Sequence, residues 1–327
     1  MGKVNWGVLG TAGIAKGQTI PGMKEAQNCA LYAIAGRNEE KVRDYQHRFG
    51  FEKAYTCYED LLADPEVKAV YIPLPNSLHF EWTKKALQSG KHVLCEKPLT
   101  PTAAEAEELF RIAEDNNVIL MEAFAFLHSP FIKAVRDEIT SGVIGEIRYL
   151  ESQFVTSDYE LSNIRMRRET KGGCTYDLGC YNAAMIGWMT GMEPDEIKAA
   201  GIFSPQGVDV LTGAVFSYKN GAKAFMNCGM VLQTEANRRI DQLRIDGTKG
   251  SIQSTAEFNG CGDLTYTITA GEKEETKHVA VPNNYRLEVE QLGRCIQNGE
   301  LPYVSKEFSL GNLRTLERIL SLIGYKN

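Results

Sequence analysis

The sequence lacks long apolar stretches, runs of basic residues and paired cysteine motifs. Its 327 residues carry 36 lysines and arginines against 42 aspartates and glutamates, so the net charge is −6. Because no basic cluster could neutralise phosphates or an anionic bilayer, we expect neither a nucleic acid nor a membrane partner. No apolar run approaches the ~20 residues that cross a bilayer, and the N-terminus has no signal-peptide pattern. We therefore expect a cytoplasmic protein.

The eight cysteines are scattered, with no C-x-x-C pair and no histidine at zinc-ligand spacing, so we expect reduced thiols and no metal site. No serine-nucleophile pattern and no phosphate-transfer loop is present either, which leaves hydrolases and kinases unsupported. The apolar share of 43% and the charged share of 24% are ordinary for a globular protein. The length favours two domains.

The first ~125 residues alternate short apolar runs with helical patterns, which is typical of βαβ units around a parallel sheet. Thr102 and Glu105 fit a capping box ahead of an amphipathic helix. The predicted strands are residues 4–9, 30–35, 69–72, 93–95 and 118–121. We expect a Rossmann dinucleotide-binding domain over residues 1–124.

The remaining chain, residues 125–327, has longer β-branched and aromatic runs. Asn220-Gly221 suits a tight hairpin, and residues 242–246 alternate polar with apolar side chains before a turn at 247–250. Helical periodicity returns at 289–296 and 310–320. We expect an α+β domain with a mostly antiparallel open sheet, which would bind substrate and form the oligomer. The chain as a whole is then of the α/β class.

A glycine-rich turn follows the first predicted strand. Gly10-Thr11-Ala12-Gly13-Ile14-Ala15 lies where a G-x-G-x-x-G dinucleotide fingerprint would lie, although only the first fingerprint glycine is kept. Alanine at the other two positions still permits close approach, and the amides that begin the next helix can hold a pyrophosphate. A turn that serves packing alone remains an alternative.

Arg37 follows the second predicted strand, where an NAD site has an acidic residue, and Lys41 comes one helical turn later. A guanidinium matches a phosphate in a bidentate way, so this pair predicts NADP as the preferred cofactor, with NAD as the second choice. A solvated arginine that begins a helix is the alternative.

Five segments occur in order along the chain: residues 71–79, Glu96-Lys97-Pro98, residues 121–124, residues 172–181 and residues 246–250. In these segments the chain resembles the Gfo/Idh/MocA family of oxidoreductases, in particular its dimeric dihydrodiol dehydrogenases, NADP-linked D-xylose dehydrogenases and glucose-fructose oxidoreductases. The resemblance covers nearly the whole length.

The resemblance implies the catalytic residues. Lys97 follows a predicted parallel strand, where open α/β sheets place ligands, and in this family that lysine points at the carbon that exchanges hydride. Asp177 and Tyr181 are four apart and so share a helical face. Tyr181 stands where many members have histidine, and it becomes the candidate acid/base, while Asp177 would orient the sugar or the lysine. A solvated lysine and a buried aromatic ring are the structural alternatives.

The remaining site residues come from the motifs described above and from their positions along the chain, and Asn76 and His79 resemble family positions that face the dinucleotide. The expected cofactor-binding residues are Gly10, Thr11, Ala12, Gly13, Ile14, Arg37, Lys41, Leu74, Asn76, His79, Glu96 and Lys97. Arg165, Asp177 and Tyr181 are the expected substrate contacts. Arg168, Glu122 and His128 are further candidates, for which structural hydrogen bonding is an equal explanation.

The expected activity is hydride transfer between NAD(P) and a hydroxyl or carbonyl carbon of a sugar, polyol or trans-dihydrodiol. An NAD-dependent glycosidase with tightly bound cofactor and a non-catalytic nucleotide sensor are the alternatives. A pure sensor needs neither Lys97 nor Tyr181. An apolar sheet face needs covering, so we expect a homo-dimer or homo-tetramer.

Overall fold

The computed structural model describes residues 2–157, 159–232 and 239–326. The chain forms two compact units. The first comprises Met1–His128 and Pro282–Ser309, and the second comprises Ser129–Val281 and Leu310–Asn327. Pro282–Ser309, which the sequence analysis grouped with the C-terminal half, thus lies in the first unit because its helix packs against the first helix of the chain.

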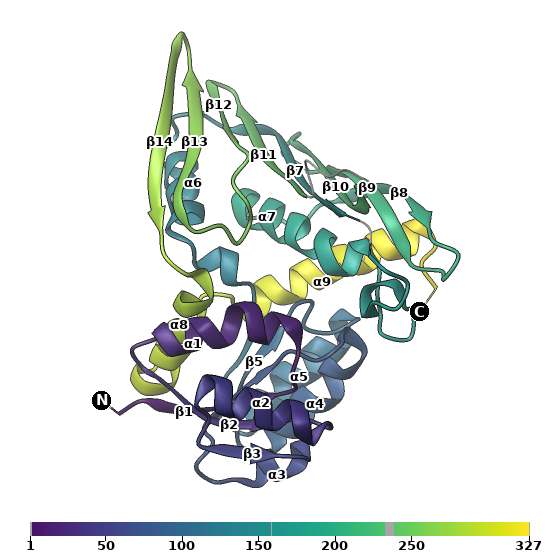
Figure 1. Cartoon of the computed structure of the whole chain (residues 1–327). Coiled ribbons are helices and arrows are strands. Elements are labelled where there is room, and N and C mark those ends of the chain that lie inside the picture. Colours follow the sequence, from purple (N-terminus) through teal and green to yellow (C-terminus); the bar gives the residue numbers. More distant parts are fainter. Residues whose placement is uncertain (1, 158, 233–238, 327) are drawn as a thin grey trace. The chain divides into compact units, whose positions relative to one another are not determined.

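The first unit is built on a six-stranded parallel sheet in the order β3-β2-β1-β4-β5-β6 (Figure 1). The order reverses between β1 and β4, which makes the carboxyl ends of these strands the expected ligand edge. The strands are β1 (Val4–Leu9), β2 (Cys29–Ala35), β3 (Lys53–Tyr55), β4 (Ala69–Ile72), β5 (His92–Glu96) and β6 (Leu120–Ala123). The helices are α1 (Ile20–Glu25), α2 (Glu39–Phe49), α3 (Tyr58–Ala63), α4 (Asn76–Gln88), α5 (Ala103–Asp115) and α8 (Asn284–Asn298).

Local sequence signals explain most of these boundaries. The predicted capping box is confirmed: the Thr102 side chain accepts from the Glu105 amide, and the Glu105 carboxylate accepts from the Thr102 amide. The last predicted strand begins two residues too early. The amide of Val118 still bonds the carbonyl of Ala113 and Asn117 has a φ of 54°, so the chain is completing the helix end there.

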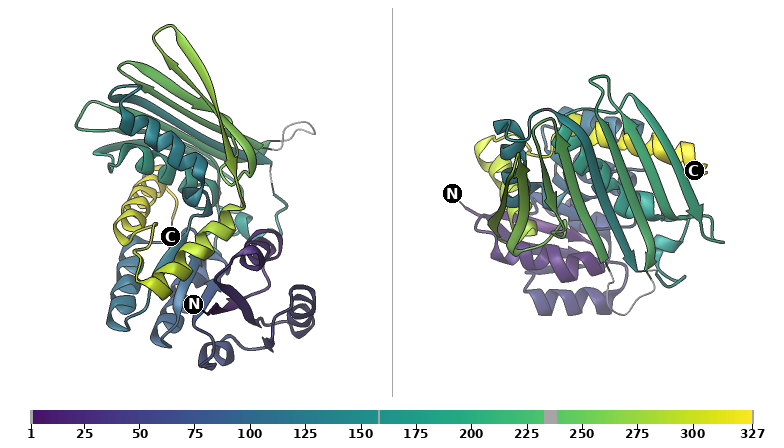
Figure 2. Two further views of the ribbon diagram at one scale, coloured as in Figure 1. Left: turned by 90° about the vertical axis from the view of Figure 1, so that its left-hand side faces the viewer. Right: turned by 90° about the horizontal axis from the view of Figure 1, so that it is seen from above.

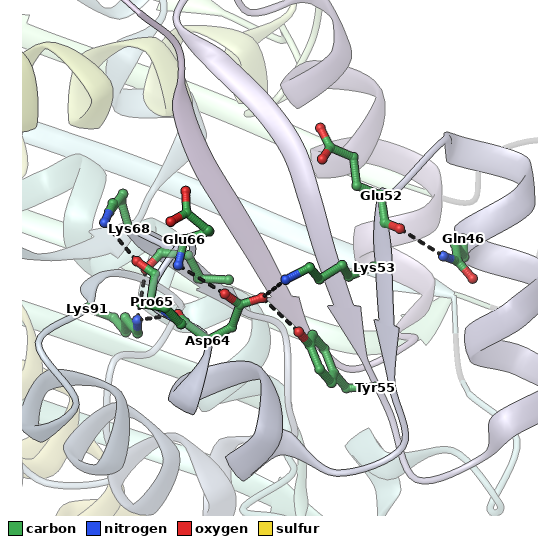
Figure 3. A network of polar contacts seen from close by, with 10 residues as sticks. Gln46, Glu52, Lys53, Tyr55, Asp64, Pro65, Glu66, Lys68 and Lys91 are labelled. Carbon is green, nitrogen blue, oxygen red and sulfur yellow. Dashed lines mark hydrogen bonds and ion pairs between the residues drawn. The ribbon is translucent and has the colours of Figure 1, made fainter.

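A polar network fixes the edge strand β3 to the end of α3 (Figure 3). The Asp64 carboxylate accepts from Lys53 Nζ at 2.8 Å and from the Tyr55 hydroxyl at 2.7 Å. Burial opposes the charge on Asp64, but these hydrogen bonds prevail and lower its pKa to about 2. Lys91 Nζ donates to the carbonyls of Asp64 and Val67 at 2.7 and 2.8 Å. The network therefore has a structural role, because it stabilises the β3 edge of the sheet.

The second unit holds an eight-stranded sheet in the order β14-β13-β12-β11-β7-β10-β9-β8. All of its pairings are antiparallel except that of β7 with β10, so the predicted mostly antiparallel open sheet is confirmed. One face of the sheet carries no helix in the part of the chain that is described (Figure 2, right). The strands are β7 (Ile147–Ser157), β8 (Glu196–Phe203), β9 (Asp209–Ser217), β10 (Lys223–Leu232), β11 (Arg239–Gly247), β12 (Gly250–Ser254), β13 (Gly262–Ala270) and β14 (Lys273–Val281).

The helices of the second unit are α6 (Pro130–Ser141), α7 (Cys180–Thr190) and the part of α9 (Lys306–Ile323) that begins at Leu310. The predicted hairpin is present, with the Tyr218 amide 3.1 Å from the carbonyl of Ala222 between β9 and β10. The predicted turn at 247–250 joins β11 to β12. Among residues 2–157, 159–232 and 239–326, no helix has both the length and the apolar character to cross a membrane.

Candidate active site

The glycine-rich turn after β1 begins at Gly10, a position that disfavours any residue with a side chain. Gly10 has a φ of +117°, and a Cβ there would lie 3.1 Å from Leu74 Cδ2. The hydroxyl of Tyr45 lies 3.1 Å and 3.2 Å from the carbonyl oxygens of Thr11 and Ala12, which holds the turn in place. The space beside Gly13 is open, with no atom within 4 Å of a Cβ built there.

The chain enters a helix directly after this turn. Gly13 and Ile14 lead into a π-helical segment, Ala15–Thr19, which continues into α1. The first amides of a helix have no intrahelical acceptor and therefore point at whatever lies beyond its end. A narrow glycine turn, carbonyls held to one side and free helix amides together fit the pyrophosphate of a dinucleotide.

Arg37 and Lys41 both lie exposed at the start of α2. The Asn38 side chain caps this helix by accepting from the Lys41 amide at 2.9 Å. Burial raises the pKa of the Tyr58 hydroxyl, and the positive charge of the Arg37 guanidinium opposes that rise. Arg37 thus interacts with Tyr58, a residue distant from it in the chain.

Glu96 and Lys97 end β5 and begin the next loop. The Glu96 side chain is only 8% exposed and turns into the unit, where Oε1 accepts from the Tyr71 hydroxyl at 2.5 Å. The hydroxyl of Thr19 in turn donates to that of Tyr71 at 2.8 Å. Glu96 is thereby engaged by the protein itself, whereas Lys97 lies half-buried at the ligand edge of the sheet.

Leu74, Asn76 and His79 follow β4. Leu74 covers Gly10, and Asn76 is the first residue of α4. His79 is fully buried, with Nδ1 2.9 Å from the carbonyl oxygen of Pro98 and Nε2 2.7 Å from that of Leu74. Burial lowers the pKa of this imidazole. His79 therefore lies between two loops at the ligand edge, with one ring nitrogen facing a carbonyl oxygen of each, and the neutral imidazole donates its single N–H to one of them.

The candidate residues of the second unit lie at the start of α7. Asp177 belongs to a π-helical segment, Thr175–Gly179, and Tyr181 is the second residue of α7. Asn259 Nδ2 donates to the Tyr181 hydroxyl at 3.3 Å. The ring of Tyr181 packs edge-on against Phe154 and Phe258, at centroid distances of 5.4 and 5.5 Å.

Arg165 is brought to Asp177 across the loop before the helix, with Nε 2.6 Å from Oδ2. The ring of Tyr159 lies 5.2 Å from the guanidinium carbon of Arg165. Charge interaction with Asp177 raises the pKa of Arg165, in spite of its partial burial. The second unit therefore groups three of the predicted substrate residues, because Tyr181 also acts electrostatically on Arg165.

Asp209 on β9 fixes the start of the segment that carries Asp177. Its Oδ2 accepts from the Thr175 amide at 2.8 Å and from the Thr175 hydroxyl at 2.6 Å. A Cβ on Gly173 would lie 2.1 Å from Asp209 Oδ1, and Gly173 has a φ of +111°, so only glycine fits. The sequence did not indicate Asp209 as a site residue, because it lies 34 residues along the chain from Thr175.

The weaker candidates have structural partners. Arg168 bonds the carbonyl of Lys326 and lies against the ring of Tyr325. His128 is half-buried beside the ring of Tyr303, and the burial of its imidazole lowers its pKa to about 3. Glu122 is buried at the end of β6, and burial raises its pKa to about 7. In the described ranges, no three His, Cys, Asp or Glu side chains are grouped to hold a metal ion.

A parallel sheet with a dinucleotide turn at its reversal point, joined in one chain to a second unit with an open sheet, defines a two-domain nicotinamide-dependent oxidoreductase. Comparison with known sequences agrees. Residues 4–124 match the family described as "Oxidoreductase family, NAD-binding Rossmann fold", and residues 132–253 match the GFO/IDH/MocA C-terminal domain. The chain belongs to the Gfo/Idh/MocA family and is an NAD(P)-dependent oxidoreductase.

Individual relatives cover almost the whole chain. D-xylose 1-dehydrogenase (NADP(+)) 2 of Haloferax volcanii is 34% identical, over 96% of this chain and 95% of its own. A trans-1,2-dihydrobenzene-1,2-diol dehydrogenase of Xenopus tropicalis is 28% identical, over 97% and 95%. The crystal structure of KijD10, a 3-ketoreductase from Actinomadura kijaniata with NADP and TDP-benzene, is similar with a TM-score of 0.91 at 28% identity, covering 98% and 97%.

Proposed function

We propose that this protein is an NADP-dependent dehydrogenase or reductase that acts on a hydroxyl or carbonyl carbon of a neutral sugar or polyol. The observation that carries the proposal is the position of Lys97 at the carboxyl end of β5, in a sheet whose order reverses two strands away. Relatives that act on D-xylose, on a dihydrodiol and on a dTDP-linked ketosugar support the same hydride-transfer chemistry.

The cofactor would be held by the turn from Gly10 to Ile14, with Arg37 and Lys41 at the 2′-phosphate of NADP. A phosphate accepts two parallel hydrogen bonds from a guanidinium, and NAD offers no such partner. Leu74 and Asn76 would line the same edge. When bound, the dinucleotide accepts or supplies hydride at its nicotinamide ring.

The proton would be handled by Tyr181. Its phenolate takes the proton of the substrate hydroxyl during oxidation, and its phenol returns the proton during reduction. A free phenol has a pKa of about 10, so a positive charge that favours the phenolate assists this step at neutral pH. Lys97 would stabilise negative charge on the reacting oxygen.

A neutral substrate follows from the charges around Tyr181 in the second unit. Arg165 is paired with Asp177, and Arg239 donates to Asp241 from both Nε and Nη2. Each arginine thus has an adjacent carboxylate. Such pairs offer donors and acceptors side by side, which suits the hydroxyl groups of a sugar better than a phosphate.

The helix-free face of the second sheet would form the homo-dimer or homo-tetramer. It exposes the apolar side chains Val215, Val231 and Ile240 on three strands of this sheet. Exposed apolar groups on a sheet face favour association. A stable monomer in light scattering at micromolar concentration contradicts this part of the proposal. A cytoplasmic location stays a prediction.

The experiment that tests the function has two steps. Protein fluorescence is titrated with NADPH and then with NADH, and a panel of pentoses, hexoses and polyols is then followed at the nicotinamide absorbance. Tight NADPH binding with sugar-dependent reduction of NADP⁺ is the expected result. Binding without net redox change would favour a glycosidase or a sensor, and no binding would refute the proposal.

A further inference from the structure

The loop that carries Lys97 is held by three side chains of the first unit, one for each of its first three residues. The Lys97 amide lies 3.3 Å from Glu96 Oε2. The carbonyl oxygen of Pro98 lies 2.9 Å from His79 Nδ1. The amide of Leu99 donates to Glu122 Oε1 at 2.8 Å.

These side chains come from three different elements. Glu96 ends β5, His79 lies on α4 and Glu122 lies on β6. His79 and Glu122 are fully buried. A buried polar group without a partner is costly, so these contacts define one favoured path of the loop. The backbone that bears Lys97 is fixed from the neighbouring helix on one side and the neighbouring strand on the other.

We propose that His79 and Glu122 are positioning residues for Lys97. They clamp the carbonyl of Pro98 and the amide of Leu99, and thereby fix the direction in which the Lys97 side chain leaves the loop. A charged group stabilises a reacting oxygen only if its geometry is set in advance, and a shift of about 1 Å costs on the order of 100-fold in rate. The inference rests on the role proposed above for Lys97.

The charged groups around Glu122 are compatible with this role. Burial raises its pKa to about 7, hydrogen bonds with Ser309 and the Leu99 amide oppose that rise, and the charges of Lys97 and Glu96 act in opposite directions with smaller effect. Glu122 therefore interacts electrostatically with both Glu96 and Lys97. Its Oε1 can accept from the Leu99 amide whether or not the carboxyl group carries a proton, because a carboxylic acid keeps an acceptor oxygen.

Two pairs of variants distinguish a role of His79 and Glu122 in holding the loop from a role in packing alone. Glu122→Gln retains an acceptor oxygen near the Leu99 amide, whereas Glu122→Leu removes it. The amide nitrogen of asparagine approximates Nδ1 of histidine and that of glutamine approximates Nε2. His79→Asn therefore keeps a donor for Pro98, whereas His79→Gln keeps one only for Leu74. His128→Gln is the control for loss of an imidazole elsewhere in the unit, because His128 is a half-buried histidine whose ring packs against Tyr303.

The experiment measures kcat, the Kd for NADPH, the melting temperature and amide hydrogen exchange at Leu99 for the full chain. Glu122→Leu and His79→Gln are expected to lower kcat by tenfold to 100-fold, on the order expected for a misplaced group, with a nearly unchanged Kd for NADPH. Both should speed exchange at Leu99. Glu122→Gln and His79→Asn should recover most of kcat, and His128→Gln should resemble the wild type.

The proposal is overturned if folded Glu122→Leu and His79→Gln keep wild-type kcat and wild-type exchange at Leu99. It is also overturned if kcat falls equally in both members of each pair, in step with melting temperature, because that result indicates a role in stability alone. If the wild type turns over no substrate, the proposed function fails, while the exchange at Leu99 still decides whether the clamp holds the loop.

Discussion

Arg165 Nε lies 2.6 Å from Asp177 Oδ2, across the loop that precedes α7. The side chain of Asp177 is 14% exposed and that of Arg165 is 36% exposed, so the pair is only partly shielded from solvent. One edge of the guanidinium is engaged by the carboxylate. The pair therefore holds two predicted substrate-binding side chains in a fixed mutual orientation.

Asp177→Asn should weaken the binding of substrate. The amide retains an oxygen but loses the charge that holds Arg165, and hydrogen bonds to charged groups contribute about 1.5–3 kcal/mol. We expect KM for the sugar to rise about tenfold or more, while the Kd for NADPH stays within about twofold. Steady-state kinetics check this. Asp263→Asn, which removes an exposed carboxylate beside His278, is the control and should behave as the wild type.

Tyr181→Phe removes the proposed acid/base but keeps the ring that packs against Phe154 and Phe258. General acid–base catalysis contributes about 100-fold to 10,000-fold, so kcat should fall by at least about 100-fold. The fold should be retained, because the ring keeps its packing while the hydroxyl loses its hydrogen bond from Asn259. Turnover at the wild-type rate would exclude Tyr181 from the mechanism. Tyr266→Phe serves as the control for loss of a tyrosine hydroxyl in the same unit.

Cofactor preference should depend on Arg37. Arg37→Ala should raise the Kd for NADPH by about 10-fold to 100-fold and leave that for NADH within about twofold, because only NADPH has a 2′-phosphate for the guanidinium. Tyr58→Phe should have a smaller effect in the same direction, since it removes the hydroxyl that bonds Arg37. Fluorescence titration measures both constants. Arg43→Ala on the same helix is the control, and equal losses for both cofactors would argue against the assignment.

Stability in acid should depend on His128. Burial lowers its pKa to about 3 in the folded protein, against about 6.5 in the unfolded chain. Between these values the unfolded chain binds a proton that the folded protein does not, so stability falls as the pH falls through this window. From pH 6.5 to 4.5 the loss is on the order of 2 kcal/mol.

His128→Phe should remove this contribution. Its free energy of unfolding, measured with denaturant at several pH values, should decline less than that of the wild type below about pH 6.5. The exposed His47→Phe on α2 should leave the pH dependence as it is. Parallel curves for His128→Phe and the wild type would contradict the burial argument.

The sequence predicted features that depend on neighbours in the chain. The strands β1 and β4 were predicted with their observed ends, and the capping box at Thr102 was confirmed. These features follow from apolar patterns and from hydrogen bonds between residues three positions apart. The position of Lys97 after β5 was predictable for the same reason.

Contacts between distant segments could not be predicted in this way. Asp209 holds Thr175 from another strand, and Glu122 holds Leu99 from the next strand of the sheet. The parallel pairing of β7 with β10, in a sheet that is otherwise antiparallel, likewise depends on tertiary contacts and could not be predicted from local sequence. The periodicity of α8 predicted a helix, but it did not contain the information that this helix packs against α1.

The most direct test of the central claim is the initial rate of NADPH formation from NADP⁺ with D-xylose and other neutral aldoses, for the wild type and Lys97→Met. We predict measurable turnover of at least one neutral sugar by the wild type and a loss of about 100-fold or more in kcat for the variant. Lys84→Met controls for removal of a half-buried lysine that pairs with Glu108 in the same unit. Equal rates for the wild type and Lys97→Met, or no turnover of any neutral sugar by a protein that binds NADPH, would contradict the account.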